Sequence, residues 1–383
     1  MHTIRLPLED GTSTLYNLRG PHDFGAHDQP FTSRIAFAAA HVVAARDHDR
    51  RAGEAAIDWE ATLAYRRYLW SYGFAVAEAM DTAQRGMGLD WSLAQTLIRR
   101  SIAEAKAVGG IIACGAGTDH LPPSSEHTLD DVITAYESQV GFVEGLGGRV
   151  ILMASRALAA CARGPDDYMR VYDRILSQVS QPVIIHWLGD MFDPQLTGYW
   201  GSCDPDRAME TCLAIIQAHP AKVDGIKLSL LDAEREIDMR RRLPAGVRMY
   251  TGDDFNYPML ILGDAHGHSD ALLGIFDAIA PAAAAALRAL DAGNTQRYCE
   301  LLEPTVALAR HIFQPPTYYY KTGVTFLAYL NGYQDHFVML GGQEKARSVQ
   351  HLARLFVLAD HAGLLRDPAL AVQRMSAYLL DAA

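Results

Sequence analysis

Short apolar runs alternate with longer amphipathic stretches along most of the chain. Eight runs are rich in β-branched or small residues, and they cover residues 35–40, 73–77, 110–114, 150–154, 182–187, 223–228, 247–251 and 272–276. Helical periodicity fills several intervals between them, including residues 59–72, 93–107, 129–146 and 166–180. Strands that alternate with helices form a parallel sheet, and eight such strands close a barrel. The pattern predicts an α/β protein built on a (β/α)8 (TIM) barrel, with a doubly wound open sheet as the alternative.

The two ends of the chain follow other patterns. Short alternating pieces at residues 3–6 and 13–16 flank Asp10-Gly11, which is typical of a hairpin. From about residue 281 only helical periodicity remains, over residues 282–292, 296–312, 322–330 and 346–362. We therefore expect a short hairpin in an N-terminal extension over residues 1–30, the barrel over residues 31–285 and a C-terminal helical region over residues 286–383.

Composition narrows the range of functions. The 34 Lys and Arg residues against 45 Asp and Glu residues give a formal net charge of −11, which disfavours nucleic acid and anionic membranes as partners. No apolar stretch approaches the roughly 18 residues of a transmembrane helix, and the N-terminal segment lacks the apolar part of a signal peptide. The five cysteines are widely spaced and include no CxxC pair, which favours reduced thiols. We expect a cytoplasmic protein that binds a small molecule.

The positions of the predicted strands in the barrel identify the candidate functional residues. Active sites of such barrels lie at the carboxyl ends of the strands. The polar or aromatic residues at those ends are Asp81 and Thr82 after the second run, Thr118 after the third, Arg156 after the fourth, His186 and Trp187 in the fifth, Lys227 in the sixth, and Asp253 and Asp254 after the seventh.

Lys227 is the strongest catalytic candidate. The chain has only five lysines, and this one lies within an apolar run, directly after Gly225-Ile226. Burial there would disfavour the ammonium form and lower the pKa, giving an amine that can attack a carbonyl group. The alternative is a lysine that pairs with Asp253 or Asp254 only to satisfy its charge.

The surroundings of Lys227 carry a family resemblance. Gly225-Ile226-Lys227, followed by Thr251-Gly252-Asp253-Asp254, resembles the GIK…SGDD pattern of the dihydrodipicolinate synthase/N-acetylneuraminate lyase superfamily. Ala116-Gly117-Thr118 resembles the family's turn after strand three. The resemblance implies a (β/α)8 class I aldolase or lyase, whose lysine forms an imine with a 2-keto acid without a metal cofactor. It also implies a homo-oligomer, either a dimer or a tetramer, from a divergent and uncharacterised branch.

The sequence departs from the family pattern in three segments that the resemblance places near the substrate. The carboxylate-binding GTTGE motif is replaced by residues 79–85, where Thr82 is the one remnant. The strand-four tyrosine that shuttles protons is absent from residues 155–158, and His186-Trp187 replaces a Tyr-Asn pair. An imidazole titrates near neutral pH, so His186 is the expected acid–base group, unless it is a structural histidine.

The leading hypothesis is a Schiff-base-forming aldolase or lyase for a small keto acid or oxidised sugar. Lys227 and His186 are the expected catalytic residues. The expected substrate contacts are Asp81, Thr82, Thr118, Arg156, Trp187, Asp253 and Asp254. The guanidinium of Arg156 could bind a carboxylate or phosphate group through two of its nitrogens, or it could pair with a neighbouring acidic residue.

Two other functions stay open. One is a sugar isomerase or hydrolase that uses a divalent metal, held by His120, His186 and nearby acids; the cluster Asp264-Ala265-His266-Gly267-His268-Ser269-Asp270 is conspicuous here. The other is a binding protein that keeps the pocket without catalysis.

Overall fold

The computed structural model describes residues 2–25, 30–47, 49 and 53–382. Of the predicted N-terminal extension, residues 1 and 26–29 lie outside the described residues. The chain divides into two compact units. One contains Arg34–Ala40 and Ala75–Leu273, and the other contains Met1–Ser33, His41–Phe74 and Gly274–Ala383. The first unit holds every strand of the predicted barrel.

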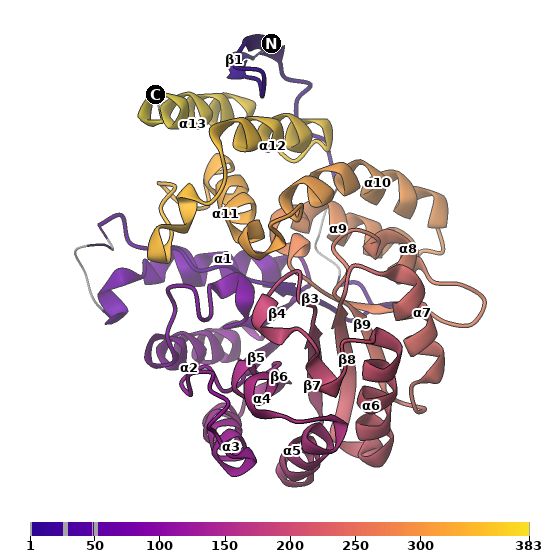
Figure 1. The fold of residues 1–383 in the computed structure, drawn as a ribbon. Coiled ribbons are helices and arrows are strands. Elements are labelled where there is room, and N and C mark those ends of the chain that lie inside the picture. Colours follow the sequence, from indigo (N-terminus) through magenta and orange to yellow (C-terminus); the bar gives the residue numbers. More distant parts are fainter. Residues whose placement is uncertain (1, 26–29, 48, 50–52, 383) are drawn as a thin grey trace. The chain divides into compact units, whose positions relative to one another are not determined.

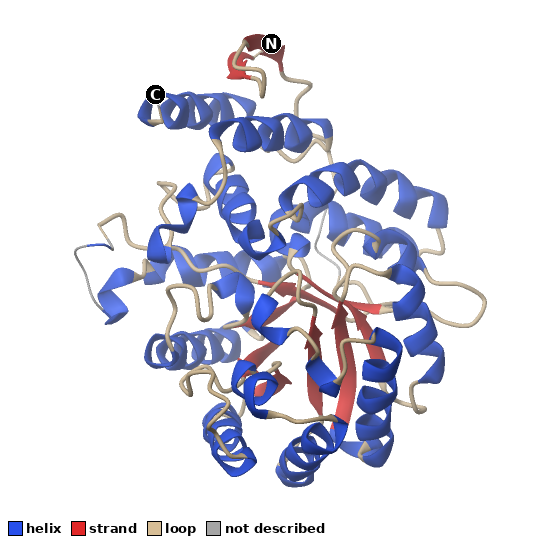
Figure 2. Cartoon of the chain, viewed as in Figure 1, coloured by secondary structure: helices blue, strands red, loops and turns tan. Residues whose placement is uncertain are grey.

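Eight parallel strands close a barrel in this first unit (Figures 1 and 2). They are β3 (Ala36–Ala39), β4 (Ala75–Glu78), β5 (Ile112–Ala116), β6 (Arg149–Leu152), β7 (Val183–Leu188), β8 (Val223–Ser229), β9 (Arg248–Thr251) and β10 (Asp270–Leu273). Neighbours follow chain order, and β10 closes the ring by pairing with β3. The predicted barrel is confirmed, and the doubly wound alternative is wrong. The last predicted run reached residue 276, but the chain is already helical from Ile275.

Helices of the barrel unit follow the strands in turn, as the helical periodicity predicted. The longer ones are α2 (Trp91–Val108), α3 (Leu129–Gly145), α5 (Pro165–Gln178), α6 (Pro205–Ala218) and α7 (Ala233–Arg242), and the short ones are α4 (Arg156–Cys161) and α8 (Tyr257–Leu262). Side chains of Asp90, Thr128, Asp204 and Asp232 accept hydrogen bonds from first-turn amides. Such caps fix where each helix begins and thereby where each loop ends.

The barrel interior mixes small and large side chains. Alanines on β3, β4 and β5 lie with Ile151, Ile184 and Leu272 in one buried cluster. Phe37 and Tyr250 meet edge to face across it, with ring centroids 5.9 Å apart. A Cβ atom on Gly225 would lie 2.6 Å from the Tyr250 ring, so only glycine fits on β8 at that position.

The second unit contains a hairpin and six long helices among the described residues. Strands β1 (Thr3–Pro7) and β2 (Ser13–Asn17) pair antiparallel, as predicted. The helices are α1 (Trp59–Ser71), α9 (Ile275–Asp291), α10 (Thr295–Ile312), α11 (Tyr320–Leu330), α12 (Val349–His361) and α13 (Pro368–Asp381). The predicted boundary between residues 285 and 286 falls inside α9, so the chain does not change its structure there.

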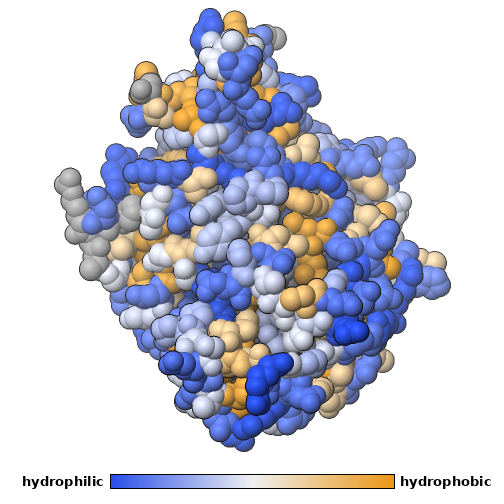
Figure 3. Space-filling model, in the orientation of Figure 1, coloured by the Kyte–Doolittle hydropathy of each residue, from blue (hydrophilic) through white to orange (hydrophobic). Residues whose placement is uncertain are grey.

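Hydrophilic residues cover most of the face drawn in Figure 3, and apolar residues form smaller patches between them. In the part of the chain that the structure describes, no helix has both the length and the apolar character that crossing a bilayer requires.

Glu236 on α7 is a buried carboxyl group behind the barrel wall. Its side chain accepts a hydrogen bond from Ser269 Oγ at 2.7 Å, and only 1% of the residue is exposed. Burial raises the pKa of Glu236 to about 8, although the hydroxyls of Ser269 and Thr251 favour the ionised form. The folded state therefore holds a proton that the unfolded state has released at neutral pH.

This proton makes stability depend on pH. The pKa is raised on folding, so the stabilisation is complete below about pH 4.5 and is lost as the pH rises through about 8, at a cost on the order of 5 kcal/mol. We predict that Glu236→Gln flattens this dependence in urea unfolding between about pH 5 and 8. Glu234→Gln, at an exposed site on the same helix, is the control. An unchanged slope in the Glu236 variant would contradict the assignment.

Candidate active site

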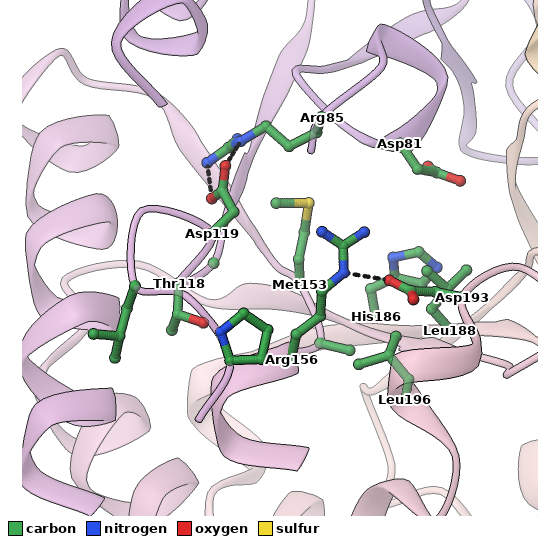
Figure 4. A pocket seen from close by; sticks show the side chains of 14 residues that line it. Asp81, Arg85, Thr118, Asp119, Met153, Arg156, His186, Leu188, Asp193 and Leu196 are labelled. Carbon is green, nitrogen blue, oxygen red and sulfur yellow. Dashed lines mark hydrogen bonds and ion pairs between the residues drawn. The ribbon is translucent and has the colours of Figure 1, made fainter. Parts of the chain in front are cut away.

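A pocket lies at the carboxyl ends of β4 to β7 (Figure 4). Its volume, including the part that is open to solvent, is about 650 Å³. Its lining residues include Asp81, Arg85, Thr118, Asp119, Met153, Arg156, His186, Leu188, Asp193 and Leu196. Four sequence-predicted residues thus come together from four different strand ends: Asp81, Thr118, Arg156 and His186. Barrel active sites occupy this end, so the pocket is the candidate site.

Lys227 lies beside this pocket rather than in its lining. It pairs in register with His186 on β7 and with Tyr250 on β9. The residue is only 5% exposed. A Cβ atom on Gly252 would lie 2.9 Å from Lys227 Cε and would collide with Ser229 Oγ. Because Gly252 has no side chain, it leaves space for the side chain of Lys227.

The electrostatic surroundings of Lys227 favour an uncharged amine. Burial lowers its pKa below the ordinary value, while the carboxylates of Asp81 and Asp254 act in the opposite direction. Because the net direction is downward, the neutral form is more populated at neutral pH than for a solvated lysine. A neutral amine is the form that attacks a carbonyl carbon.

His186 is the second buried titratable group at this end of the barrel. It is 2% exposed, and its Nε2 lies 3.1 Å from Ser229 Oγ. Burial and then the neighbouring Lys227 charge hold its pKa well below the ordinary value, against the effect of Asp81. The imidazole is therefore neutral at neutral pH and able to accept a proton.

Arg156 has the second of the two roles that the sequence left open, since it pairs with a neighbouring acid. Its Nε donates to the Asp193 carboxylate at 2.5 Å, and the guanidinium extends into the pocket (Figure 4). About a quarter of its side chain is exposed. Asp193 therefore orients the guanidinium, whose planar fork can bind an acidic or hydroxylated group. Sequence reasoning missed Asp193, because its partner lies 37 residues away.

A second buried ion pair was also missed. Arg85 donates to both carboxylate oxygens of Asp119, at 2.7 and 2.8 Å, and to the carbonyl oxygens of Ala79 and Gly115. Burial would raise the pKa of Asp119, but the Arg85 guanidinium brings it below its ordinary value. With a further bond to Gln139, the donors of Arg85 hold the two loops together. Arg85 ends the segment in which the family resemblance places the carboxylate-binding motif.

The two aspartates after β9 have different surroundings. Asp253 accepts hydrogen bonds from the amides of Phe255 and Asn256 and from the Asn256 side chain, so it holds the turn into α8. Asp254 is 4% exposed and acts electrostatically on Lys227. Of the predicted pair, Asp254 is the one whose charge acts on Lys227.

Three further residues were predicted to contact the substrate: Thr118, Trp187 and Thr82. The Thr118 hydroxyl lies 2.6 Å from that of Ser155, which caps α4. Trp187 packs edge to face against Trp200, because neighbouring residues on a strand point to opposite sides and His186 faces inward. Thr82 is 1% exposed and is not part of the pocket lining.

The conspicuous His and Asp segment lies elsewhere. Residues 264–268 precede β10 and so belong to the amino end of the strands, away from the pocket. The Asp264 carboxylate pairs with Arg240 and Arg241 of α7. Over the described ranges, no three His, Cys, Asp or Glu residues gather closely enough to hold a metal ion.

The closed barrel with its carboxyl-end pocket defines a (β/α)8 protein with the dihydrodipicolinate synthase fold. The chain belongs to the family described as "Protein of unknown function (DUF993)", whose model matches residues 4–382. A comparison with curated protein sequences gave no match.

Solved structures of dihydrodipicolinate synthases resemble this chain over most of its length. The enzyme named 4-hydroxy-tetrahydrodipicolinate synthase from Methylacidiphilum fumariolicum SolV aligns with a TM-score of 0.64 and 14% identity, covering 89% of this chain and 99% of its own. The synthase from Thermotoga maritima gives 0.63 and 16%, covering 87% and 100%. That from Acinetobacter baumannii, complexed with pyruvate, gives 0.60 and 16%, also covering 87% and 100%. The resemblance predicted around Lys227 is confirmed, and at these identities it establishes the fold.

The position of Asp81 gives a test of the site's electrostatics. Its carboxylate favours the charged amine, so Asp81→Asn should lower the pKa of Lys227 further. The pH dependence of Lys227 acetylation, measured by peptide mass spectrometry, reports this pKa. Labelling of the exposed Lys345 serves as the internal reference. A Lys227 inflection that stays in place or moves to higher pH would refute the predicted coupling.

Proposed function

We propose that the protein is a Schiff-base-forming lyase or aldolase for a small carbonyl compound, with Lys227 as the nucleophile. The observation that carries the proposal is a buried lysine, with a lowered pKa, at the carboxyl end of a barrel strand. The fold supports it further, since proteins of similar structure are named dihydrodipicolinate synthases and one of them holds pyruvate.

The chemistry begins with attack of the neutral Lys227 amine on the carbonyl carbon. A carbon–nitrogen bond forms, and the carbonyl oxygen leaves as water with the two amine hydrogens. Protonation of the imine makes it an acceptor for an electron pair. For carbon–carbon cleavage, a base takes the proton of a hydroxyl group on the β carbon, the bond between the α and β carbons breaks, the β carbon leaves as an aldehyde, and the electron pair passes to the iminium to give an enamine. For loss of water, a base instead takes a proton from the α carbon to give the enamine, which then expels the β-hydroxyl group as water with a returned proton. Protonation of the enamine left by cleavage, and hydrolysis of the iminium in either route, release the product and restore the Lys227 amine.

The residues around the pocket supply the other functions. His186 is proposed to take the substrate proton and return it, because its imidazole is neutral and adjoins Lys227 in register. Arg156, oriented by Asp193, is proposed to bind the far end of the substrate. Asp81 and Thr118 complete the proposed contacts from the ends of β4 and β5.

Borohydride reduction tests the imine directly. Incubation with a panel of small ketones, keto acids and ketoses, followed by reduction, should add the reduced carbonyl compound to Lys227 as detected by peptide mass spectrometry. Lys227→Met should abolish the label and reduce any turnover by at least about 1,000-fold, the loss expected when a covalent route is removed.

Lys345→Met is the matched control, because Lys345 is exposed. It should keep full labelling at Lys227. The proposal fails if the folded wild-type protein is not labelled at Lys227 by any member of the panel, or if labelling and turnover persist in Lys227→Met.

A further inference from the structure

The amine of Lys227 lies within the influence of two carboxylates. Asp254 follows β9 two residues after Gly252, at which a Cβ atom would lie 2.9 Å from Lys227 Cε. Asp81 follows β4 and lines the pocket together with His186, which pairs in register with Lys227 (Figure 4). The charges of both carboxylates act on the lysine. The surroundings of the reacting nitrogen are therefore acidic.

The cationic groups of the pocket already have acidic partners. Arg85 is paired with Asp119 through two hydrogen bonds, and Arg156 is paired with Asp193 through its Nε. Both carboxylates lie within the same lining. Among the residues that line the described pocket, the charges of Arg85 and Arg156 are thus each offset in part by a carboxylate.

This arrangement discriminates between two kinds of carbonyl substrate. A 2-keto acid carries its carboxylate on the very carbon that the lysine attacks, so that charge would meet Asp81 and Asp254. Neighbouring like charges are unfavourable in a buried site. A hydroxymethyl group at the same position instead donates a hydrogen bond to a carboxylate, and such charge-assisted bonds are strong.

We infer that the substrate carbonyl is flanked by hydroxyl-bearing carbons and not by a carboxylate: it is a ketose or an oxidised polyol. This inference rests on the proposed imine at Lys227 and specifies what that imine is formed from. Asp81 is the specificity-determining residue, and an acidic group is accepted only at the distant end, where Arg156 lies.

Hydroxyacetone and pyruvate form a matched pair for the test. Both are methyl ketones, and they differ only in a hydroxymethyl or a carboxylate group on the carbonyl carbon. With cyanoborohydride as the trap, we expect hydroxyacetone to label Lys227 at least tenfold faster than pyruvate at equal concentration. Labelling of the exposed Lys345 in the same samples corrects for the intrinsic reactivity of the two ketones.

Asp81→Asn should shrink this preference at least threefold, by slowing hydroxyacetone and speeding pyruvate. Asp190→Asn removes the same charge from an exposed aspartate after β7 and should leave the preference unchanged. Circular dichroism establishes that each variant is folded before it is compared.

The outcomes separate the two claims. Equal or faster labelling by pyruvate overturns the substrate class while the imine at Lys227 stands. A preference that Asp81→Asn does not alter overturns the role of Asp81. If neither ketone nor any ketose labels Lys227 in the folded protein, the imine and the substrate class fall together.

Discussion

Burial of one amine organises the functional end of this barrel. An ammonium group loses much of its hydration when it enters a protein interior, and the protein compensates either by supplying opposite charge or by letting the proton leave. Around Lys227 both responses occur, because burial lowers the pKa while Asp81 and Asp254 partly restore it. The balance gives an amine that is less protonated than that of a solvated lysine, in surroundings that are acidic.

The barrel itself enforces this balance. Strand pairing places His186, Lys227 and Tyr250 side by side on three neighbouring strands. Backbone hydrogen bonds fix that register, so the Cα atoms of these residues stay neighbours as long as the sheet is intact. Gly252 leaves room for the lysine side chain. The place of Lys227 at the end of the barrel therefore follows from strand register and from glycine at one crowded position.

Much of the fold and part of the site could be predicted from sequence. The apolar runs predicted all eight strands, since each strand overlaps one of them, although most boundaries differ by one or two residues. Lys227 stood out as a lysine inside such a run. Trp187 is different: strand alternation implies that it cannot face the same way as His186, and the structure packs it against Trp200. A contact between Trp187 and the substrate therefore stays a prediction.

The ion pairs could not be predicted in the same way. Arg85 and Asp119 are 34 residues apart, and Arg156 and Asp193 are 37 apart. Each pair joins loops after different strands, and loop conformation depends on turns and packing that no periodicity reveals. The same holds for Asp253 and Asp254, adjacent in sequence, one of which holds a turn while the other acts on the lysine.

The most direct measurement is a crystal structure of the protein reduced with cyanoborohydride in the presence of hydroxyacetone. We predict continuous density from Lys227 Nζ to the former carbonyl carbon, with the hydroxymethyl group directed at the Asp81 carboxylate. An adduct on another residue, or an unmodified Lys227 in protein whose mass shows the label, would contradict the account.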